Sequence, residues 1–213
     1  MINRIISLIN QKYPLTEIDS GEFANINVSG MKFSISAYKA EGLGHVSVMN
    51  ATGFFGLMMM DTLIINPTEI DLPLYSYDRI FAMGNDTLII ELYDTLLGDF
   101  SEDSLNEIKA KYSYIPEHDL GEHWYNSIKL KCSVSNKGKK TDTESLNQMA
   151  LEYFISYLNT PANNAALEEK QKKARFYVDG LIEKGGPPTN AFKKSIGKDK
   201  TRELFESILF GTK

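Results

Sequence analysis

The sequence has one cysteine, Cys132, among 213 residues, so the chain forms no internal disulfide. A single thiol also excludes a cysteine-rich zinc site and fits a reducing compartment. Long hydrophobic runs are missing too, since no segment reaches the roughly 18 apolar residues that a membrane-spanning helix needs. The first ten residues contain a short apolar run without a small-residue cleavage site, which indicates a helix and not a signal peptide. We therefore expect a cytoplasmic protein that does not enter a membrane.

Motifs for nucleotides, metals and serine nucleophiles are also absent. Gly42 and Gly44 lack the third glycine and the strand–helix context of a dinucleotide site, and there is no P-loop. No G-x-S-x-G segment is present. His118 and His123 are five positions apart, which does not match the H-E-x-x-H spacing, so we expect two solvated loop histidines and no metal.

Composition and charge favour one globular domain over residues 1–213, with 42% hydrophobic and 24% charged residues. The net charge of −5 is uneven, because residues 1–128 hold 7 Lys and Arg against 18 Asp and Glu, whereas residues 129–213 hold 16 against 10. The basic part is typical of solvated helix faces, and it also suits an anionic ligand or an acidic protein partner. The negative total argues against binding to nucleic acid.

Patterns typical of β-strands follow a short predicted helix over residues 2–12. Residues 31–37 alternate apolar and polar side chains, as in a half-buried strand. The dipeptide Gly84-Asn85 tolerates positive φ and predicts a hairpin turn. The expected strands cover residues 31–37, 45–49, 54–65, 77–83, 86–93 and 128–134.

The last third of the chain changes to helical periodicity. Thr141 and Glu144 form a capping-box pattern that opens a helix with one apolar stripe. The stripe consists of Leu146, Met149, Ala150, Tyr153, Phe154, Tyr157 and Leu158. A second helix is predicted over residues 160–184, before a Gly-Gly-Pro-Pro run, and residues 189–210 predict one or two more. Strands first and helices last favour an α+β fold with an antiparallel sheet.

Two aspartates lie in apolar surroundings and are the candidate catalytic residues. Asp61 is inside an apolar strand pattern, and Asp78 opens the next strand. Burial raises the pKa of a carboxyl group and prepares it to hold or give a proton. The commoner alternative is that each residue caps a turn or faces solvent at a strand end.

The stretch over residues 61–95 resembles the middle of the ferredoxin-dependent bilin reductases. That family has an L-P-x-(F/Y)-G-x-D segment followed by two hydrophobic strands, and residues 72–78 here read L-P-L-Y-S-Y-D. Residues 121–136 are similar to a later strand of the family and the loop after it. Residues 196–211 (IGKDKTRELFESILFG) are similar to its last helix and closing L-F motif, most of all in the phage-encoded members.

The resemblance implies a three-layer α/β/α sandwich with a central antiparallel sheet. A linear tetrapyrrole such as biliverdin would lie between the sheet and the C-terminal helices, without metal, flavin or nicotinamide. Reduced ferredoxin would supply single electrons from outside, and the protein would supply protons to a bilin radical. Asp78 matches the family's central proton donor. Asp61 occupies a place where members carry histidine or asparagine, and it would tune the site of reduction from the opposite wall.

The sequence departs from the family pattern at several positions. Ser76 replaces the glycine of the motif, and Gly186 falls where the family has a second aspartate. A glutamate that some members place on the strand before Asp61 is replaced by Ser47 or Met49.

Three hypotheses follow from the sequence. The first is a ferredoxin-dependent reductase of a bilin, which we expect to be a monomer. The cations that bind the propionate groups of the bilin would come from the basic part of the chain, among Lys193, Lys194, Lys198, Lys200 and Arg202. The second is a tetrapyrrole-binding protein without catalysis on the same scaffold, motivated by the lost aspartate. The third is an interaction protein with the aromatic stripe over residues 146–158 as its interface, although such a stripe is more often core.

Overall fold

The computed structural model describes residues 1–213, apart from the side chain of Pro187. The strands are β1 (Leu15–Ile18), β2 (Asn25–Val28), β3 (Met31–Ala40), β4 (Gly44–Gly53), β5 (Met58–Pro67), β6 (Leu74–Ala82), β7 (Asn85–Tyr93) and β8 (Val134–Lys139). The α-helices are α1 (Ile2–Lys12), α2 (Asp103–Lys111), α3 (Thr143–Asn159), α4 (Leu167–Lys184), α5 (Pro187–Ile196) and α6 (Lys198–Glu203). A π-helical turn, Leu204–Leu209, continues α6.

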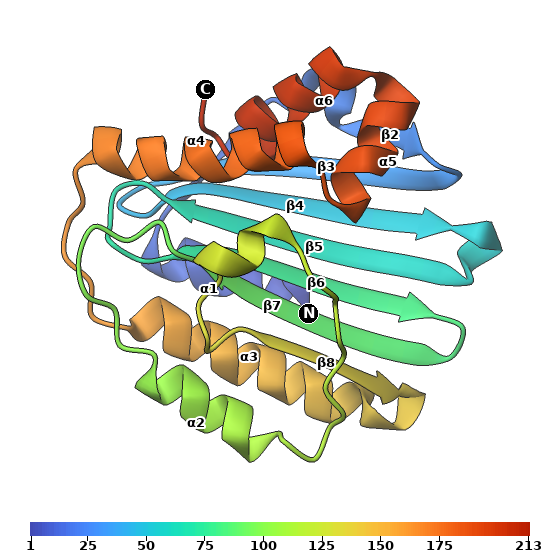
Figure 1. Ribbon diagram of the computed structural model, residues 1–213, viewed down its shortest axis with the longest axis horizontal. Helices are drawn as coiled ribbons and strands as arrows, with labels where there is room; N and C mark the ends of the chain where they lie inside the picture. The colour runs from blue at the N-terminus through green and yellow to red at the C-terminus, as the bar shows by residue number, and fades with distance from the viewer.

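The strands form one antiparallel sheet in the order β1-β3-β4-β5-β6-β7-β8. β2 shares the outer edge of β3 with β1: β1 pairs with residues 37–40, and β2 pairs with residues 31–34. Helices α1, α2 and α3 cover one face of the sheet, whereas α4, α5 and α6 cover the other (Figure 1). The predicted α+β class, a three-layer α/β/α sandwich around a central antiparallel sheet, is therefore confirmed.

Alternation along the strands divides the side chains between two cores. On one face, the Tyr75 ring packs 4.8 Å from the Tyr157 ring of α3. On the other face, the Phe33 ring lies 5.3 Å from the Phe192 ring of α5. Since adjacent residues point to opposite faces, Tyr77 joins the α3 core, whereas Asp78 faces the late helices.

The aromatic stripe of α3 is a core feature and not an exposed interface. All seven residues predicted for the stripe are buried. Two of its hydroxyl groups find backbone acceptors: Tyr153 donates to the carbonyl of Cys132 at 3.0 Å, and Tyr157 donates to that of Pro73 at 2.9 Å. The hypothesis that this stripe docks another protein is therefore wrong.

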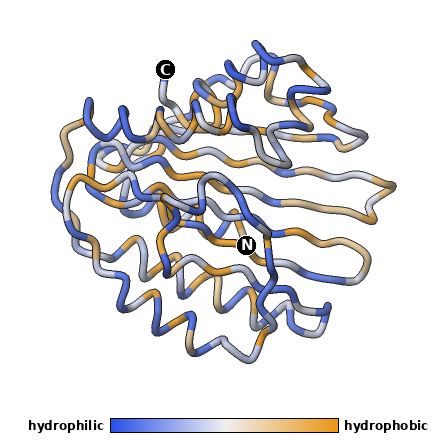
Figure 2. Tube along the Cα trace, in the orientation of Figure 1, coloured by the Kyte–Doolittle hydropathy of each residue, from blue (hydrophilic) through white to orange (hydrophobic). Residues whose placement is uncertain are grey.

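Two predicted strands are wrong in part. Phe54–Gly56 form a 3₁₀ turn between β4 and β5 instead of beginning a strand, and Phe55 is fully exposed at φ 58°. Figure 2 shows this hydrophobic turn at the tip of the hairpin. The strand predicted over residues 128–134 does not form before Val134, where β8 begins: Ile128 ends a 3₁₀ turn, and a further turn follows at residues 131–132. In both segments, apolar residues gave a strand-like pattern although the backbone turns.

Two other boundaries are shifted. The β6–β7 turn is Met83-Gly84, one residue before the predicted dipeptide, with φ 51° and 74°. Helix α4 begins at Leu167 rather than at residue 160. The segment before it pairs with the loop ahead of β6, where the amide of Ala165 donates to the carbonyl of Glu69 at 3.1 Å. None of the helices within the described residues combines the length and apolar character that crossing a membrane requires.

Candidate functional site

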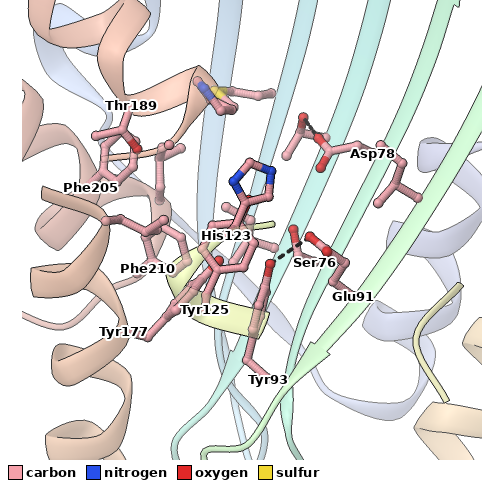
Figure 3. Close-up of a pocket in the computed structure, with 18 of the residues that line it drawn as sticks. Ser76, Asp78, Glu91, Tyr93, His123, Tyr125, Tyr177, Thr189, Phe205 and Phe210 are labelled. Atoms are coloured by element: carbon pink, nitrogen blue, oxygen red, sulfur yellow. Dashed lines mark hydrogen bonds between the residues drawn. The ribbon is translucent and has the colours of Figure 1, made fainter. Parts of the chain in front are cut away.

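A cavity of about 280 Å³ lies between the sheet and the late helices. Met49, Ile64 and Ile80 line its sheet wall, and Phe192, Phe205 and Phe210 line its helical wall. Figure 3 shows these walls with several polar groups between them. A largely apolar cavity with a few converging polar groups is the usual form of a small-molecule site.

Asp78 is the acid at the centre of the sheet wall. Its half-buried side chain lines the cavity, and the Thr62 hydroxyl of β5 donates a hydrogen bond to its Oδ1 (Figure 3). Desolvation raises the pKa of Asp78 from 3.8 to about 6; the Thr62 hydrogen bond opposes this rise, and the nearby charge of Glu91 adds to it. Asp78 is therefore able to hold a proton close to neutral pH and release it to a bound molecule.

Glu91 is a second acid on the same wall. It is buried on β7 and lines the cavity. The Tyr93 hydroxyl donates to Glu91 Oε2 at 2.6 Å, and Lys129 Nζ lies 3.1 Å from Glu91 Oε1. The carboxyl is thus bound from one side by a phenol and from the other by an ammonium group.

Three tyrosines complete the polar end of the cavity. Tyr93 stacks on Tyr177 of α4 with ring centroids 4.2 Å apart, and Tyr125 meets Tyr93 edge-on at 5.7 Å. Burial raises the pKa of Tyr125 to about 12, and it raises the pKa values of Tyr93 and Tyr177 well above 10. All three phenols therefore stay neutral and offer flat surfaces and hydroxyl donors.

The segment that carries Tyr125 is held against α4 by Trp124. The Trp124 Nε1 donates to the carbonyl of Gly185 at 3.1 Å, and the indole lies where a side chain on Gly180 would be. Glycine at position 180 thus lets the ring approach the helix backbone closely. His123 stacks on Tyr125 at 4.9 Å and lines the cavity, so it is not the solvated loop histidine predicted from the sequence.

The end of the chain is anchored on the sheet by three consecutive carbonyl groups. His45 Nε2, Ser47 Oγ and Asn66 Nδ2 each lie 2.7 Å from the carbonyl oxygens of Ile208, Leu209 and Phe210, respectively. Leu209 and Phe210 are both part of the cavity wall. This row of polar side chains on β4 and β5 therefore fixes the helical wall relative to the sheet.

Asp61 lies away from the cavity. It follows Met60 and precedes Thr62, both of which line the cavity, so its side chain points to the other face of the sheet. There it accepts a hydrogen bond from Asn50 Nδ2 at 2.7 Å. The structure thus brings Asp78 into the candidate site and separates Asp61 from it. The wall opposite Asp78, where Asp61 was expected, is formed by the late helices.

The cations considered for propionate binding lie outside the cavity. None of these five residues lines it: Lys193, Lys194, Lys198, Lys200 and Arg202. Arg202, for example, pairs with Asp179 at 2.9 Å and with Glu183 at 2.7 Å on the outer surface of the late helices. Lys198 also pairs with Glu183, and Lys200 pairs with Glu22, so three of these five cations are held in ion pairs within the protein.

The positions that depart from the family pattern do face the cavity. Ser76, Gly186 and Met49 all line it, whereas Ser47 anchors the chain end. Ser76 is paired with Glu91 across β6 and β7. The carboxyl group expected at position 186 is absent, and Glu91 is the second acid that the cavity has within the described residues.

Sequence reasoning missed Thr62 and Glu91. Both carry the signal that marked Asp61, a polar residue inside an apolar strand pattern. That Thr62 and Glu91 point to the same face of the sheet as Asp78 becomes visible only when the strands are aligned. Thr62 pairs with Asp78, and Ser76 pairs with Glu91.

Comparisons with known proteins establish the fold. No protein-family model matches the chain, and no curated protein sequence matches it. Among solved structures, it is similar to phytochromobilin synthase from tomato in complex with biliverdin. The TM-score is 0.79 at 13% sequence identity, over 99% of this chain and 82% of the tomato protein. The sheet and helical layers therefore follow the architecture of that synthase.

Proposed function

We propose that this protein binds a linear tetrapyrrole between the sheet and the late helices and reduces it with electrons from ferredoxin. The observation that carries the proposal is Asp78, a carboxyl group at the wall of an apolar cavity whose pKa is raised to about 6. The shared fold with a synthase solved in complex with biliverdin supports the ligand class.

The cavity suits the chemistry of a bilin. Pyrrole N–H groups are donors, and Asp78, Glu91 and Ser76 present acceptor oxygens on the sheet wall. The flat conjugated rings match the aromatic side chains of Tyr177 and Phe210 on the other wall. No Lys or Arg occurs among the described lining residues, so the propionate groups would remain at the mouth, in contact with water.

The reaction adds two electrons and two protons to one double bond of the bilin. Reduced ferredoxin gives one electron at a time and is oxidised. After an electron arrives, Asp78 transfers its carboxyl proton to the pigment, a new C–H or N–H bond forms, and the carboxylate takes a proton back from water. The electrons and protons of this reaction therefore balance without a hydride carrier.

The test is Asp78→Asn, with Asp61→Asn as the matched control on the opposite face of the same sheet. Asparagine keeps an acceptor for Thr62 but carries no acidic proton. We expect biliverdin affinity to stay within about threefold and turnover with reduced ferredoxin to fall by about 100-fold or more, the usual contribution of general acid catalysis. Asp61→Asn should keep normal turnover. Wild-type turnover in Asp78→Asn would refute the proposed role.

A second candidate is a tetrapyrrole-binding protein without catalysis, and Gly186 favours it. This residue lines the cavity without a side chain, where the resemblance predicts an acid. The two candidates differ in one measurement. Biliverdin added to the protein should shift in absorbance in both cases, but only a reductase should then bleach the pigment when reduced ferredoxin is supplied.

A further inference from the structure

The proposed reduction consumes two protons, and Asp78 is one carboxyl group. Glu91 is the other carboxyl on the same wall. Asp78 pairs with Ile89, two residues before Glu91 on β7, so the two acids are diagonal neighbours on one face of the sheet. Such neighbours are about 7–8 Å apart, which places both within reach of one bound molecule.

Glu91 connects the cavity to a cation at the surface. Lys129 Nζ lies 3.1 Å from Glu91 Oε1, and the Lys129 side chain is 25% exposed, against 11% for Glu91. Lys129 follows the Trp124–Ile128 turn and is held beside β7 by an isolated bridge with Tyr93. A proton from water thus has a short path to the buried carboxyl through one ammonium group.

Tyr93 fixes the other oxygen of Glu91. Its hydroxyl donates at 2.6 Å, and its ring is locked between Tyr177 and Tyr125. The carboxyl group is therefore oriented by two donors on different elements, which is the form of a prearranged proton-transfer group. Asp78 differs from it, because the donor to its carboxyl group is the neutral hydroxyl of Thr62.

We propose that Glu91 is the second proton-exchanging carboxyl of the cavity and is reloaded from solvent through Lys129. The inference rests on the proposed function. After the first electron, Asp78 protonates the pigment. After the second, Lys129 passes its ammonium proton to the Glu91 carboxylate, Glu91 transfers a proton to the pigment, and Lys129 then takes a proton from water. Two electrons from ferredoxin and two protons account for the reduced product.

The test compares Glu91→Gln with Lys129→Met, and it uses Glu152→Gln and Lys111→Met as matched controls. Lys111 and Glu152 form an exposed ion pair on the other side of the sheet, with Nζ 2.7 Å from Oε1. Glutamine at position 91 still accepts from Tyr93 but cannot exchange an acidic proton. Single-turnover reduction of bound biliverdin is followed by absorbance and electron paramagnetic resonance.

We expect Glu91→Gln to bind biliverdin within about threefold of the wild type, to take up the first electron normally and to slow the second step by about 100-fold. A half-reduced radical should therefore accumulate. Lys129→Met should slow the same step by about tenfold without changing the product. The control variants should behave as the wild type. A Glu91→Gln protein that completes the reduction at the wild-type rate without a radical would overturn the inference and leave the proposed function intact.

A second readout does not need turnover. The absorbance of bound biliverdin is titrated with pH in the wild type and in Glu91→Gln, and an unchanged protonation midpoint would also count against proton exchange by Glu91. The titratable groups that face Glu91 stay in place in both proteins: Asp78 on β6, Tyr93 on β7, Tyr125 and Lys129 on the following segment, and Tyr177 on α4. If the wild type binds biliverdin but never reduces it, a shifted midpoint would still support Glu91 while the proposed reduction fails.

Discussion

Thr62 and Asp78 occupy paired positions on β5 and β6, and the Thr62 hydroxyl donates to the Asp78 carboxyl. A donor to a carboxylate stabilises the ionised form and therefore lowers the pKa of the acid. In this protein the hydrogen bond works against desolvation, which is the larger effect and sets the pKa of Asp78 to about 6. The pair thus adjusts how readily the acid gives up its proton.

Replacing Thr62 by valine should raise the pKa of Asp78, because the hydroxyl that favours the carboxylate is lost. We expect the rate of bilin reduction to fall at a higher pH than in the wild type, by about one pH unit for every 1.4 kcal/mol that the hydrogen bond contributes. The pH profile of single-turnover reduction measures this shift. Thr62→Ser is the control that keeps the hydroxyl. A Thr62→Val profile that coincides with the wild type, or moves to lower pH, would contradict the pairing.

The raised pKa of Asp78 also predicts a cost in stability that depends on pH. The pKa of Asp78 is about 6 in the folded protein, whereas a fully solvated aspartate has a pKa of 3.8. Below pH 3.8 both the folded and the unfolded chain are protonated here, and no cost arises. As the pH rises from 3.8 to 6, the unfolded chain releases this proton before the folded one, so the contribution of Asp78 to folding becomes less favourable by up to about 3 kcal/mol.

Asp78→Asn should remove that cost. We expect the free energy of unfolding of the variant to exceed that of the wild type at about pH 8 by roughly 1–3 kcal/mol, and the difference to vanish near about pH 4. Urea unfolding at both pH values measures it, and equal m-values confirm that the same surface is exposed. A variant that is less stable than the wild type at the higher pH would show that the folded protein does not disfavour the ionised form of Asp78.

The sequence predicts helix α3 better than the site, and the residues show why. The α3 stripe depends only on a period of 3.6 residues, so all seven positions could be predicted locally. The facing of Asp61 depends on strand alternation, and a shift of one residue moves a side chain to the opposite face. The partnership of Thr62 with Asp78 depends on the register of two strands joined by a loop, which local pattern does not give.

Turn positions were missed for a different reason. Met83 and Phe55 adopt φ of 51° and 58°, a backbone region that residues with large side chains rarely occupy. Residue preferences therefore favour Gly84-Asn85 as the β6–β7 turn. The apolar residues Phe54 and Phe55 likewise favour a strand where the β4–β5 turn lies. Glu91 could not be singled out from the sequence because no motif surrounds it. Its proposed role depends on the contacts that its carboxyl group makes with Tyr93 and Lys129.

The close contact between Gly180 and Trp124 holds the wall that carries Tyr125 against α4. A Cβ at position 180 would overlap the Trp124 ring, which packs against α4 and donates from Nε1 to the carbonyl of Gly185. Gly180→Ala should lower the free energy of unfolding by about 1–3 kcal/mol through overpacking. It should also weaken biliverdin binding, because Tyr125 moves with its neighbour.

Trp124 is the only tryptophan, so its fluorescence reports on this site directly. We expect the emission of Gly180→Ala to shift to longer wavelength in the folded protein. Lys172→Ala, an exposed change on the same helix, should alter neither emission nor affinity. Unchanged emission and affinity in Gly180→Ala would mean that the wall relaxes at no cost.

Gly186 offers a way to return a carboxyl group to the cavity. Its φ of 176° is extended backbone that any residue adopts, and a Cβ there would meet its nearest neighbours, Tyr125 and Leu181, only at 3.9 and 4.0 Å. Aspartate at this position, which caps α5, is also a favourable N-cap residue. We therefore expect Gly186→Asp to fold with unchanged or slightly higher stability, by about a few tenths of a kcal/mol.

In the Glu91→Gln background, Gly186→Asp should restore the slowed second step of bilin reduction by about tenfold, because an acid again faces the pigment. Single-turnover absorbance measures that step in the double variant. Gly186→Asn in the same background is the control, since it caps the helix without an acidic proton. Equal rates for the two substitutions would show that the new side chain serves the helix and does not supply a proton to the cavity.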